Sequence, residues 1–122
     1  MAKDRKQIVR NLFTAYLNGD RKAVEDTFAD GFQFTSPYDD RIDKAEYFKR
    51  CWPGNERIRT NEIETLSEDG NDVFVLYKCT VKDGTEFRNT ERHSFAGDRI
   101  KSIEVYFGAS YKGGKFVKQK AQ

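Results

Sequence analysis

Glu91 and His93 stand two residues apart in a segment, residues 85–95, that is predicted to form a β-strand. Side chains at positions i and i+2 of a strand project from the same face, with Cβ atoms about 7 Å apart. A carboxylate and an imidazole at this spacing can together bind or polarise one polar group, and either can transfer a proton. Glu91 and His93, the only histidine of the chain, are therefore the candidate catalytic residues.

Three further residues share that strand face: Phe87, Asn89 and Phe95. The opposite register would bury Arg88 and Arg92 and expose both phenylalanines, which costs free energy in charge desolvation and in lost apolar burial. We therefore expect this face to line a pocket, with Asn89 among its polar groups. The alternative for the polar residues is a hydrogen-bonded set with a purely structural role.

Other chemistries find less support in the sequence. Cys51 could form a nucleophilic pair with His93, but a small buried hydrophobic side chain beside Trp52 explains this cysteine equally well. Cys51 and Cys79 lack C-x-x-C spacing, which indicates reduced thiols. A lone histidine without clustered ligands predicts no metal site. The lack of a glycine-rich phosphate loop predicts no nucleotide cofactor.

A chain of 122 residues and 14.2 kDa is long enough for one domain with one core. Its 10 Phe, 6 Tyr and 1 Trp make the apolar part unusually aromatic, which favours an enclosed pocket. The longest apolar run, residues 73–77, is far shorter than the roughly 20 residues of a membrane-spanning helix. The charged N-terminus has no secretory signal pattern, so we expect a cytoplasmic protein with no membrane partner.

Positive charge concentrates at the C-terminus. Residues 109–122 contain four lysines and no acid, whereas residues 1–108 hold 18 basic and 20 acidic residues. A slightly acidic body lacks the broad basic face that nucleic-acid binding requires, so no nucleic-acid partner is expected. We predict a single domain over 1–108, followed by a basic, flexible tail over 109–122.

The elements that must position the candidate residues follow a helix-first order. Apolar periodicity and capping residues predict helices over 4–18, 20–30 and 43–52, with a strand over 32–36 between the second and third. Strands at about 57–68, 72–82, 85–95 and 99–107 follow, separated by glycine turns too short to hold helices. This order predicts an α+β domain with helices packed on one face of a curved antiparallel sheet.

That element order, together with several short segments, resembles the SnoaL-like branch of the nuclear transport factor 2-like (NTF2-like) superfamily, which also holds ketosteroid isomerases and limonene epoxide hydrolases. The segments are residues 16–20, 28–30, 36–40, 43–48 and 103–108. The resemblance implies a cone-shaped curved antiparallel sheet wrapped around N-terminal helices (an NTF2-like, α-β(2)-type fold), whose mouth opens into a pocket. It also implies a homodimer.

Only part of the isomerase machinery has a counterpart in this chain. The isomerase base is an Asp before the proline that ends the first strand, and here Ser36 precedes Pro37. A hydroxyl cannot act as a carboxylate base, and Leu12 stands at the position of the family's phenol. Glu91 falls about where the isomerases keep a protonated Asp, so the resemblance favours Glu91 as the acid.

The turn after the first strand contains Asp39, Asp40 and Arg41. We interpret these residues as turn chemistry with a local ion pair, and substrate contact is the alternative. In the last strand, alternation predicts an inward apolar wall of Ile103, Val105 and Phe107.

We therefore predict a pocket for a small hydrophobic molecule with a polar group, on which Glu91 and His93 carry out general acid–base chemistry of the isomerase, cyclase or epoxide hydrolase kind. The predicted ligand-binding residues are Phe34, Ser36, Tyr38, Trp52, Phe87, Asn89, Phe95 and Phe107. The alternative is a non-catalytic ligand-binding or dimeric interaction module, in which the convex sheet face carrying Arg88, Thr90, Arg92 and Ser94 is the partner surface. Both possibilities, enzyme and non-enzyme, remain open at this point.

Overall fold

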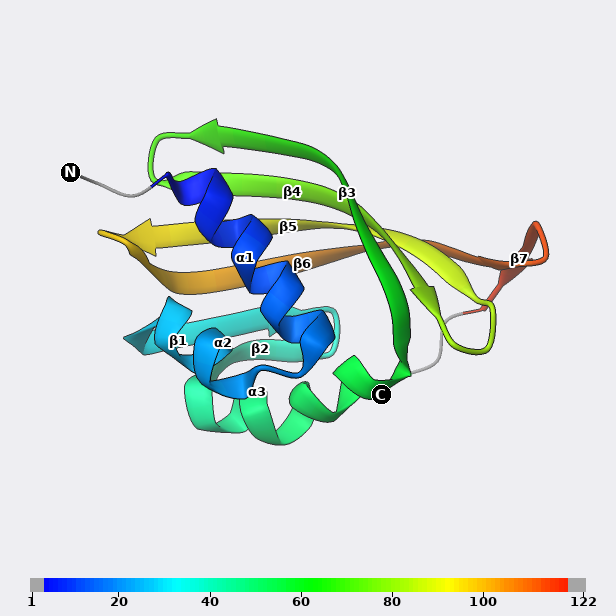
Figure 1. Ribbon diagram of the computed structural model, residues 1–122, viewed down its shortest axis with the longest axis horizontal. Helices are drawn as coiled ribbons and strands as arrows, with labels where there is room; N and C mark the ends of the chain where they lie inside the picture. The colour runs from blue at the N-terminus through cyan, green and yellow to red at the C-terminus, as the bar shows by residue number, and fades with distance from the viewer. Residues whose placement is uncertain (1–3, 119–122) are drawn as a thin grey trace.

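The computed structural model describes residues 4–118, apart from the side chains of residues 53 and 55. Helices pack against the concave face of a long curved sheet, as the predicted α+β fold requires (Figure 1). The helices are α1 (Arg5–Asn18), α2 (Arg21–Thr27), α3 (Lys44–Arg50) and the 3₁₀ helix η1 (Trp52–Arg57). The strands are β1 (Phe28–Ser36), β2 (Asp39–Asp43), β3 (Ile58–Asp69), β4 (Asp72–Val81), β5 (Glu86–Ala96), β6 (Arg99–Lys112) and β7 (Lys115–Val117).

Aspartates begin all three α-helices. Asp4, Asp20 and Asp43 each accept a hydrogen bond from a backbone amide of the first turn, which satisfies a donor that the helix itself leaves free. The predicted starts are therefore confirmed. The third helix is shorter than predicted, because the chain passes into η1 at Trp52, one residue before a proline that has no amide hydrogen to continue an α-helix.

The sheet order is β2-β1-β6-β5-β4-β3, with β7 paired to β6. Neighbours are antiparallel except β1 and β6, which run parallel, so the expected all-antiparallel sheet is wrong at this one pair. The first strand also begins at Phe28, four residues earlier than predicted, and β2 was not predicted. Both differences depend on how β1 pairs with other strands, and the periodicity of a local segment does not predict such pairing.

The chain beyond residue 108 corrects the predicted end of the last strand. β6 continues to Lys112, and Gly113 and Gly114 make the turn to β7 with positive φ angles of 59° and 80°. A two-residue turn of this conformation favours glycine and matches the twist of a hairpin. Residues 109–117, predicted to be part of a flexible tail, therefore mainly form paired strand, whereas Lys120 lies outside the described residues.

A bulge at Gly108 bends β6 against β5. Gly108 and Ala109 together lie opposite Arg88, because Phe87 pairs with Ser110 and Asn89 with Phe107. A Cβ atom on Gly108 would lie 2.1 Å from the carbonyl oxygen of Arg88, so only glycine allows this approach. The bulge lies in the part of β6 that leads toward β7 (Figure 1).

The core fills the end of the cone that α2 and α3 close. Phe28 and Phe32 stack with ring centroids 3.8 Å apart, and Tyr47 of α3 meets both edge-on. Val9 of α1 and Val24 of α2 are completely buried in the same cluster. Among the described residues no helix is long and apolar enough to cross a membrane. The aromatic packing closes this end and leaves the space toward β7 unfilled.

Candidate functional site

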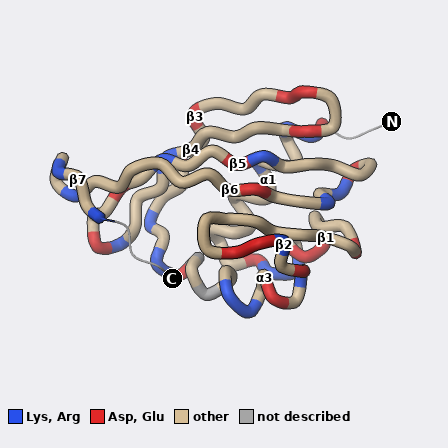
Figure 2. Tube along the Cα trace, turned by 180° about the vertical axis from the view of Figure 1, so that it is seen from behind, with Lys and Arg blue, Asp and Glu red and all other residues tan. Residues whose placement is uncertain are grey.

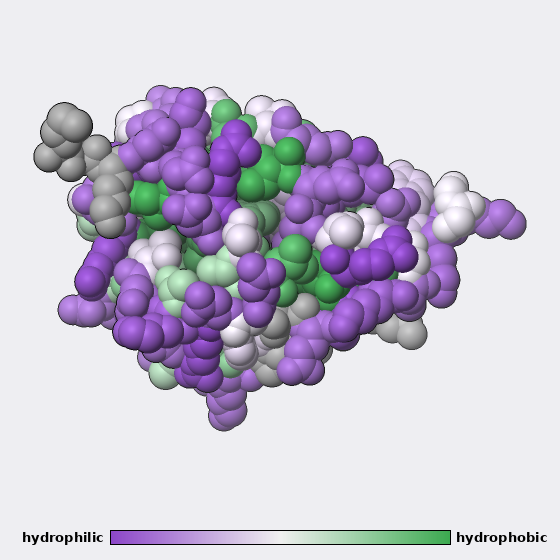
Figure 3. Space-filling view, in the orientation of Figure 1, coloured by the Kyte–Doolittle hydropathy of each residue, from purple (hydrophilic) through white to green (hydrophobic). Residues whose placement is uncertain are grey.

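A cavity of about 650 Å³ lies between α1, η1 and the concave face of the sheet. Figure 3 shows hydrophobic side chains in a recess framed by hydrophilic ones. Its walls are mainly aromatic and aliphatic, and the deeper apolar members are Leu12, Phe13, Phe34, Phe87, Ile103, Val105 and Phe107. The predicted inward wall of β6 is thus in place.

One polar cluster interrupts this apolar wall. Oε2 of Glu91 accepts a hydrogen bond of 2.6 Å from the phenol of Tyr77, and Oε1 lies 2.9 Å from Nε2 of His93. The phenol in turn accepts a hydrogen bond of 3.1 Å from the side-chain amide of Asn89. Two adjacent strands, β4 and β5, therefore hold one carboxylate in a fixed orientation.

Burial decides how the protons of this cluster are arranged. His93 is completely buried, and its Nδ1 has no hydrogen-bond partner among the described residues. A neutral imidazole that donates from Nε2 leaves only an unpaired lone pair at Nδ1, whereas the other tautomer or the imidazolium would leave a buried N–H unpaired, which costs more. The geometry therefore favours an ionised Glu91 that accepts from both Tyr77 and His93.

Tyr77 keeps its proton in this arrangement. Burial, and then the neighbouring carboxylate of Glu91, raise the pKa of the phenol well above its ordinary value of 10.0. The hydroxyl is thus a permanent donor to Glu91 at neutral pH. Sequence analysis did not single out Tyr77. The predicted turn around Asp83 could have identified it, because this turn sets the register of β4 against β5 and so pairs Tyr77 with Asn89.

Six of the predicted site residues line the cavity. They are Phe34, Ser36, Phe87, Asn89, Glu91 and Phe107. His93 does not reach the cavity wall, and its hydrogen bond is to Glu91, which does. Its place in the cluster is therefore that of a partner to the carboxylate.

The structure does not bring the other three predicted ligand-binding residues to the cavity wall. Phe95 lies in the core, with the guanidinium of Arg5 5.3 Å above its ring. Tyr38 packs edge-on against Phe107 at 5.6 Å, outside the wall. Trp52 packs against Tyr16 at 5.5 Å. The rings of Tyr38 and Trp52 thus support residues that do face the cavity.

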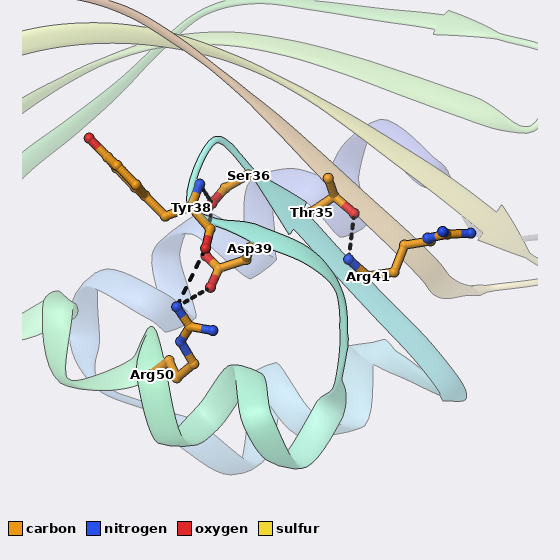
Figure 4. Close-up of polar contacts among 6 residues, drawn as sticks. All are labelled: Thr35, Ser36, Tyr38, Asp39, Arg41 and Arg50. Carbon is orange, nitrogen blue, oxygen red and sulfur yellow. Dashed lines mark hydrogen bonds and ion pairs between the residues drawn. The ribbon is translucent and has the colours of Figure 1, made fainter. Parts of the chain in front are cut away.

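Asp39 forms a second polar group on the cavity wall, at the turn between β1 and β2 (Figure 4). Its Oδ2 accepts a hydrogen bond of 2.8 Å from the hydroxyl of Ser36, which itself accepts from the backbone N–H of Tyr38 at 3.1 Å. Oδ1 lies 2.8 Å from a guanidinium nitrogen of Arg50, in an ion pair without directed hydrogen-bond geometry. The carboxylate side chain is only 7% exposed.

The predicted local ion pair of this turn is the one between Asp40 and Arg41, whereas Asp39 pairs with Arg50 of α3, outside the turn. Asp40 and Arg41 form a separate, exposed pair at 3.5 Å. Arg41 adopts a positive φ of 50° and its N–H donates to the hydroxyl of Thr35, which fixes the turn (Figure 4). Ser36 uses its hydroxyl proton within this turn.

Cys51 also faces the cavity, but as a protonated thiol. Burial raises its pKa to about 12, and the nearby carboxylate of Asp39 adds to the shift. A thiol that stays protonated at neutral pH is a poor nucleophile. His93, the proposed base, has its Nε2 hydrogen-bonded to Glu91 instead of to the thiol. The geometry thus gives no support to a cysteine–histidine pair. Within residues 4–118 no group of three His, Cys, Asp or Glu side chains could hold a metal ion.

Known proteins resemble this chain in fold more than in sequence. No curated protein matches it. An NTF2-like protein of unknown function from Cytophaga hutchinsonii is 19% identical, with a TM-score of 0.71 over 88% of this chain and 92% of its own. A proposed polyketide cyclase from Sinorhizobium meliloti is 22% identical, with a TM-score of 0.69 over 81% and 93% of the two chains. A proposed hydroxylase from Streptomyces galilaeus is 13% identical, with a TM-score of 0.74 over 85% and 88%.

These identities establish a shared fold and no shared activity. The sequence model of the SnoaL-like domain matches residues 9–103, which include α1, the turn with Asp39, and the strands that carry Tyr77 and Glu91. The resemblance inferred from short segments is therefore confirmed over most of the chain. The chain belongs to the SnoaL-like domain family, and its fold is that of NTF2-like proteins.

Proposed function

We propose that the cavity binds a small, mainly apolar molecule and that Glu91 transfers a proton to or from its polar group. The observation that carries this proposal is the position of Glu91, a carboxylate held by two donors in a wall that is mainly aromatic and aliphatic. Pockets of this kind bind the body of a ligand by apolar contact and orient it through a few polar groups.

The arrangement suits proton transfer because Glu91 begins as an anion. It can accept a proton from a carbon or hydroxyl of the substrate and return it to another atom of the same molecule, as in isomerisation or cyclisation. With an epoxide, it can accept a proton from a water that attacks the ring carbon, and return that proton to the epoxide oxygen as its C–O bond breaks. Tyr77 and His93 orient the carboxylate throughout. No step in this scheme requires Ser36 as a base.

The test compares Glu91→Gln with the wild type and with a matched control, Glu68→Gln, an exposed residue of β3. A thermal-shift screen of neutral aromatic ketones and epoxides identifies binders, and mass spectrometry then measures their turnover. We expect Glu91→Gln to retain binding and lose turnover by a factor on the order of 10² to 10⁴, the usual contribution of a general acid or base. Full turnover in this variant would contradict the proposed role of Glu91.

A non-catalytic interaction module is the second candidate function, and an exposed apolar row on the convex sheet face favours it. Leu76, Thr90 and Tyr106 pair across β4, β5 and β6, and Leu76 and Tyr106 are 36% and 56% exposed. This row lies on the face proposed from sequence as a partner surface for a homodimer. Light scattering on the wild type and Leu76→Asp tests it: a dimer that becomes monomeric supports this role, and a wild-type monomer contradicts it.

A further inference from the structure

The opening of the cavity carries an excess of positive charge. Arg57 at the end of η1, Lys112 at the end of β6 and Lys118 just after β7 all line it, together with one acid, Asp83, in the β4–β5 turn. Figure 2 shows Lys and Arg gathered around this end of the molecule, with an acidic segment among them. The turn at Gly113 and Gly114 brings Lys118 back to the opening.

These three cations face a single acid, Asp83. Hydrogen bonds from Thr85, and then the charges of Lys112 and Arg57, lower the pKa of its carboxyl, so Asp83 offsets only part of the positive charge. Arg57, Lys112 and Lys118 form no ion pair with a described carboxylate within 4.0 Å. Asp83 accepts a hydrogen bond of 2.8 Å from the backbone N–H of Thr85, so its carboxylate is engaged within its own turn. The opening therefore carries three cations against one carboxylate, which leaves a net positive charge there.

The deep wall has the opposite sign. Glu91, ionised in the arrangement derived above, is only 14% exposed and faces the same cavity. A ligand that carries a negative charge is repelled from the Glu91 end and attracted to the opening, and low-dielectric walls strengthen both effects. The charge distribution thus favours one orientation of an anionic ligand, with its charged group at the opening and its uncharged part toward Glu91.

We infer that the ligand of this cavity is an organic anion, with an apolar body inside the cone and a carboxylate or similar acidic group at the opening beside Arg57, Lys112 and Lys118. This inference rests on the proposed function, since it names the class of molecule that the same cavity takes. The basic C-terminal segment then belongs to the binding site.

The experiment compares 2-naphthoate with 2-naphthamide, which has nearly the same shape and no charge. Dissociation constants are measured by calorimetry at low and high ionic strength. The variant Lys112→Gln/Lys118→Gln is compared with Lys49→Gln/Lys101→Gln, which removes the same charge from exposed positions that do not line the cavity.

We expect the wild type to bind naphthoate about tenfold more tightly than naphthamide at low salt, and this preference to shrink at high salt because screening weakens exposed charges. The Lys112→Gln/Lys118→Gln variant loses most of the preference and the control keeps it. Equal or tighter binding of naphthamide by the wild type would overturn the inference and leave the proposed cavity function standing. Binding of neither compound would also overturn the inference, whereas the proposed function is overturned only if the thermal-shift screen finds no binder either.

Discussion

The phenol of Tyr77 on β4 donates a 2.6 Å hydrogen bond to Glu91 on β5, and so connects the carboxylate of the cavity to the neighbouring strand. Hydrogen bonds to charged groups are shorter and about twice as strong as those between neutral groups. Asn89 donates to the same phenol, so the hydroxyl of Tyr77 both donates and accepts a hydrogen bond within the protein. A ligand reaches the carboxylate only from the cavity.

Tyr77→Phe removes one donor from Glu91 and the acceptor of Asn89. We expect it to lower the free energy of unfolding by about 1–3 kcal/mol, because a buried amide and a carboxylate each lose a partner. The measurement is urea denaturation. Tyr106→Phe is the matched control: its phenol also donates to a glutamate, Glu104, at 3.0 Å, but it is 56% exposed. Equal losses in the two variants would contradict the special role of the buried pair.

Raised thiol pKa values predict a loss of stability at alkaline pH. Burial raises the pKa of Cys79 from 9.0 to about 12. Between these values an unfolded thiol releases its proton while the folded one keeps it, so the stabilisation present below pH 9.0 falls as pH rises toward 12. Urea denaturation across this range should show a steeper decline for the wild type than for Cys79→Ala.

The same comparison has an internal control at lower pH. From neutral pH to about pH 8, one unit below the ordinary thiol pKa of 9.0, both states keep most of the thiol proton, so wild type and Cys79→Ala should change nearly in parallel. Parallel behaviour that continued up to pH 11, about two units higher, would show that the thiol does not take part. Tyr77 and the other buried phenols add their own decline only above their ordinary pKa of 10.0.

Local sequence patterns predicted the parts of the site that depend on one strand. The alternation from Phe87 to Phe95 placed Asn89, Glu91 and His93 on the concave face, and all three lie there. Burying Arg88 instead would have cost charge desolvation, so a single physical argument settled the register. Helix starts at aspartates were equally local and equally predictable.

Contacts between distant segments were not predictable in this way. Whether His93 reaches the cavity or stops behind Glu91 depends on α1, whose Phe13 ring lies 6.2 Å from the imidazole. The position of Trp52 also depends on α1, because its ring packs against Tyr16 of that helix. The role of Lys118 depends on a hairpin whose pairing with β6 a basic, glycine-containing composition does not reveal. Packing and register, unlike periodicity, are set by the partner segment.

Gly108→Ala tests whether the bulge in β6 is required for the fold. The added Cβ would meet the Arg88 carbonyl at 2.1 Å, so the two strands must separate. We expect a loss of about 2–4 kcal/mol in the free energy of unfolding, within the range of severe overpacking and strain. Gly31→Ala is the matched control, because a Cβ there meets nothing within 4 Å. Similar stability of the two variants would contradict the close approach.

Ser36→Ala tests the cluster around Asp39. The hydroxyl of Ser36 is the hydrogen-bond donor to Oδ2 of a carboxylate that is only 7% exposed, and without it Asp39 keeps only the ion pair with Arg50. We expect a loss of about 1–2 kcal/mol in the free energy of unfolding, typical of a buried acceptor deprived of its partner. Ser67→Ala, at an exposed position of β3, should change stability very little.

A double-mutant cycle separates the unpaired carboxylate from a simple loss of packing at Ser36. If the cost of Ser36→Ala arises from leaving Asp39 without its donor, then the same substitution should cost much less in an Asp39→Asn background, where no buried carboxylate remains to be satisfied. The two substitutions are then strongly non-additive. Additive losses, measured by urea denaturation of all four proteins, would mean that Ser36 stabilises the turn through its contact with the Tyr38 amide and not through Asp39.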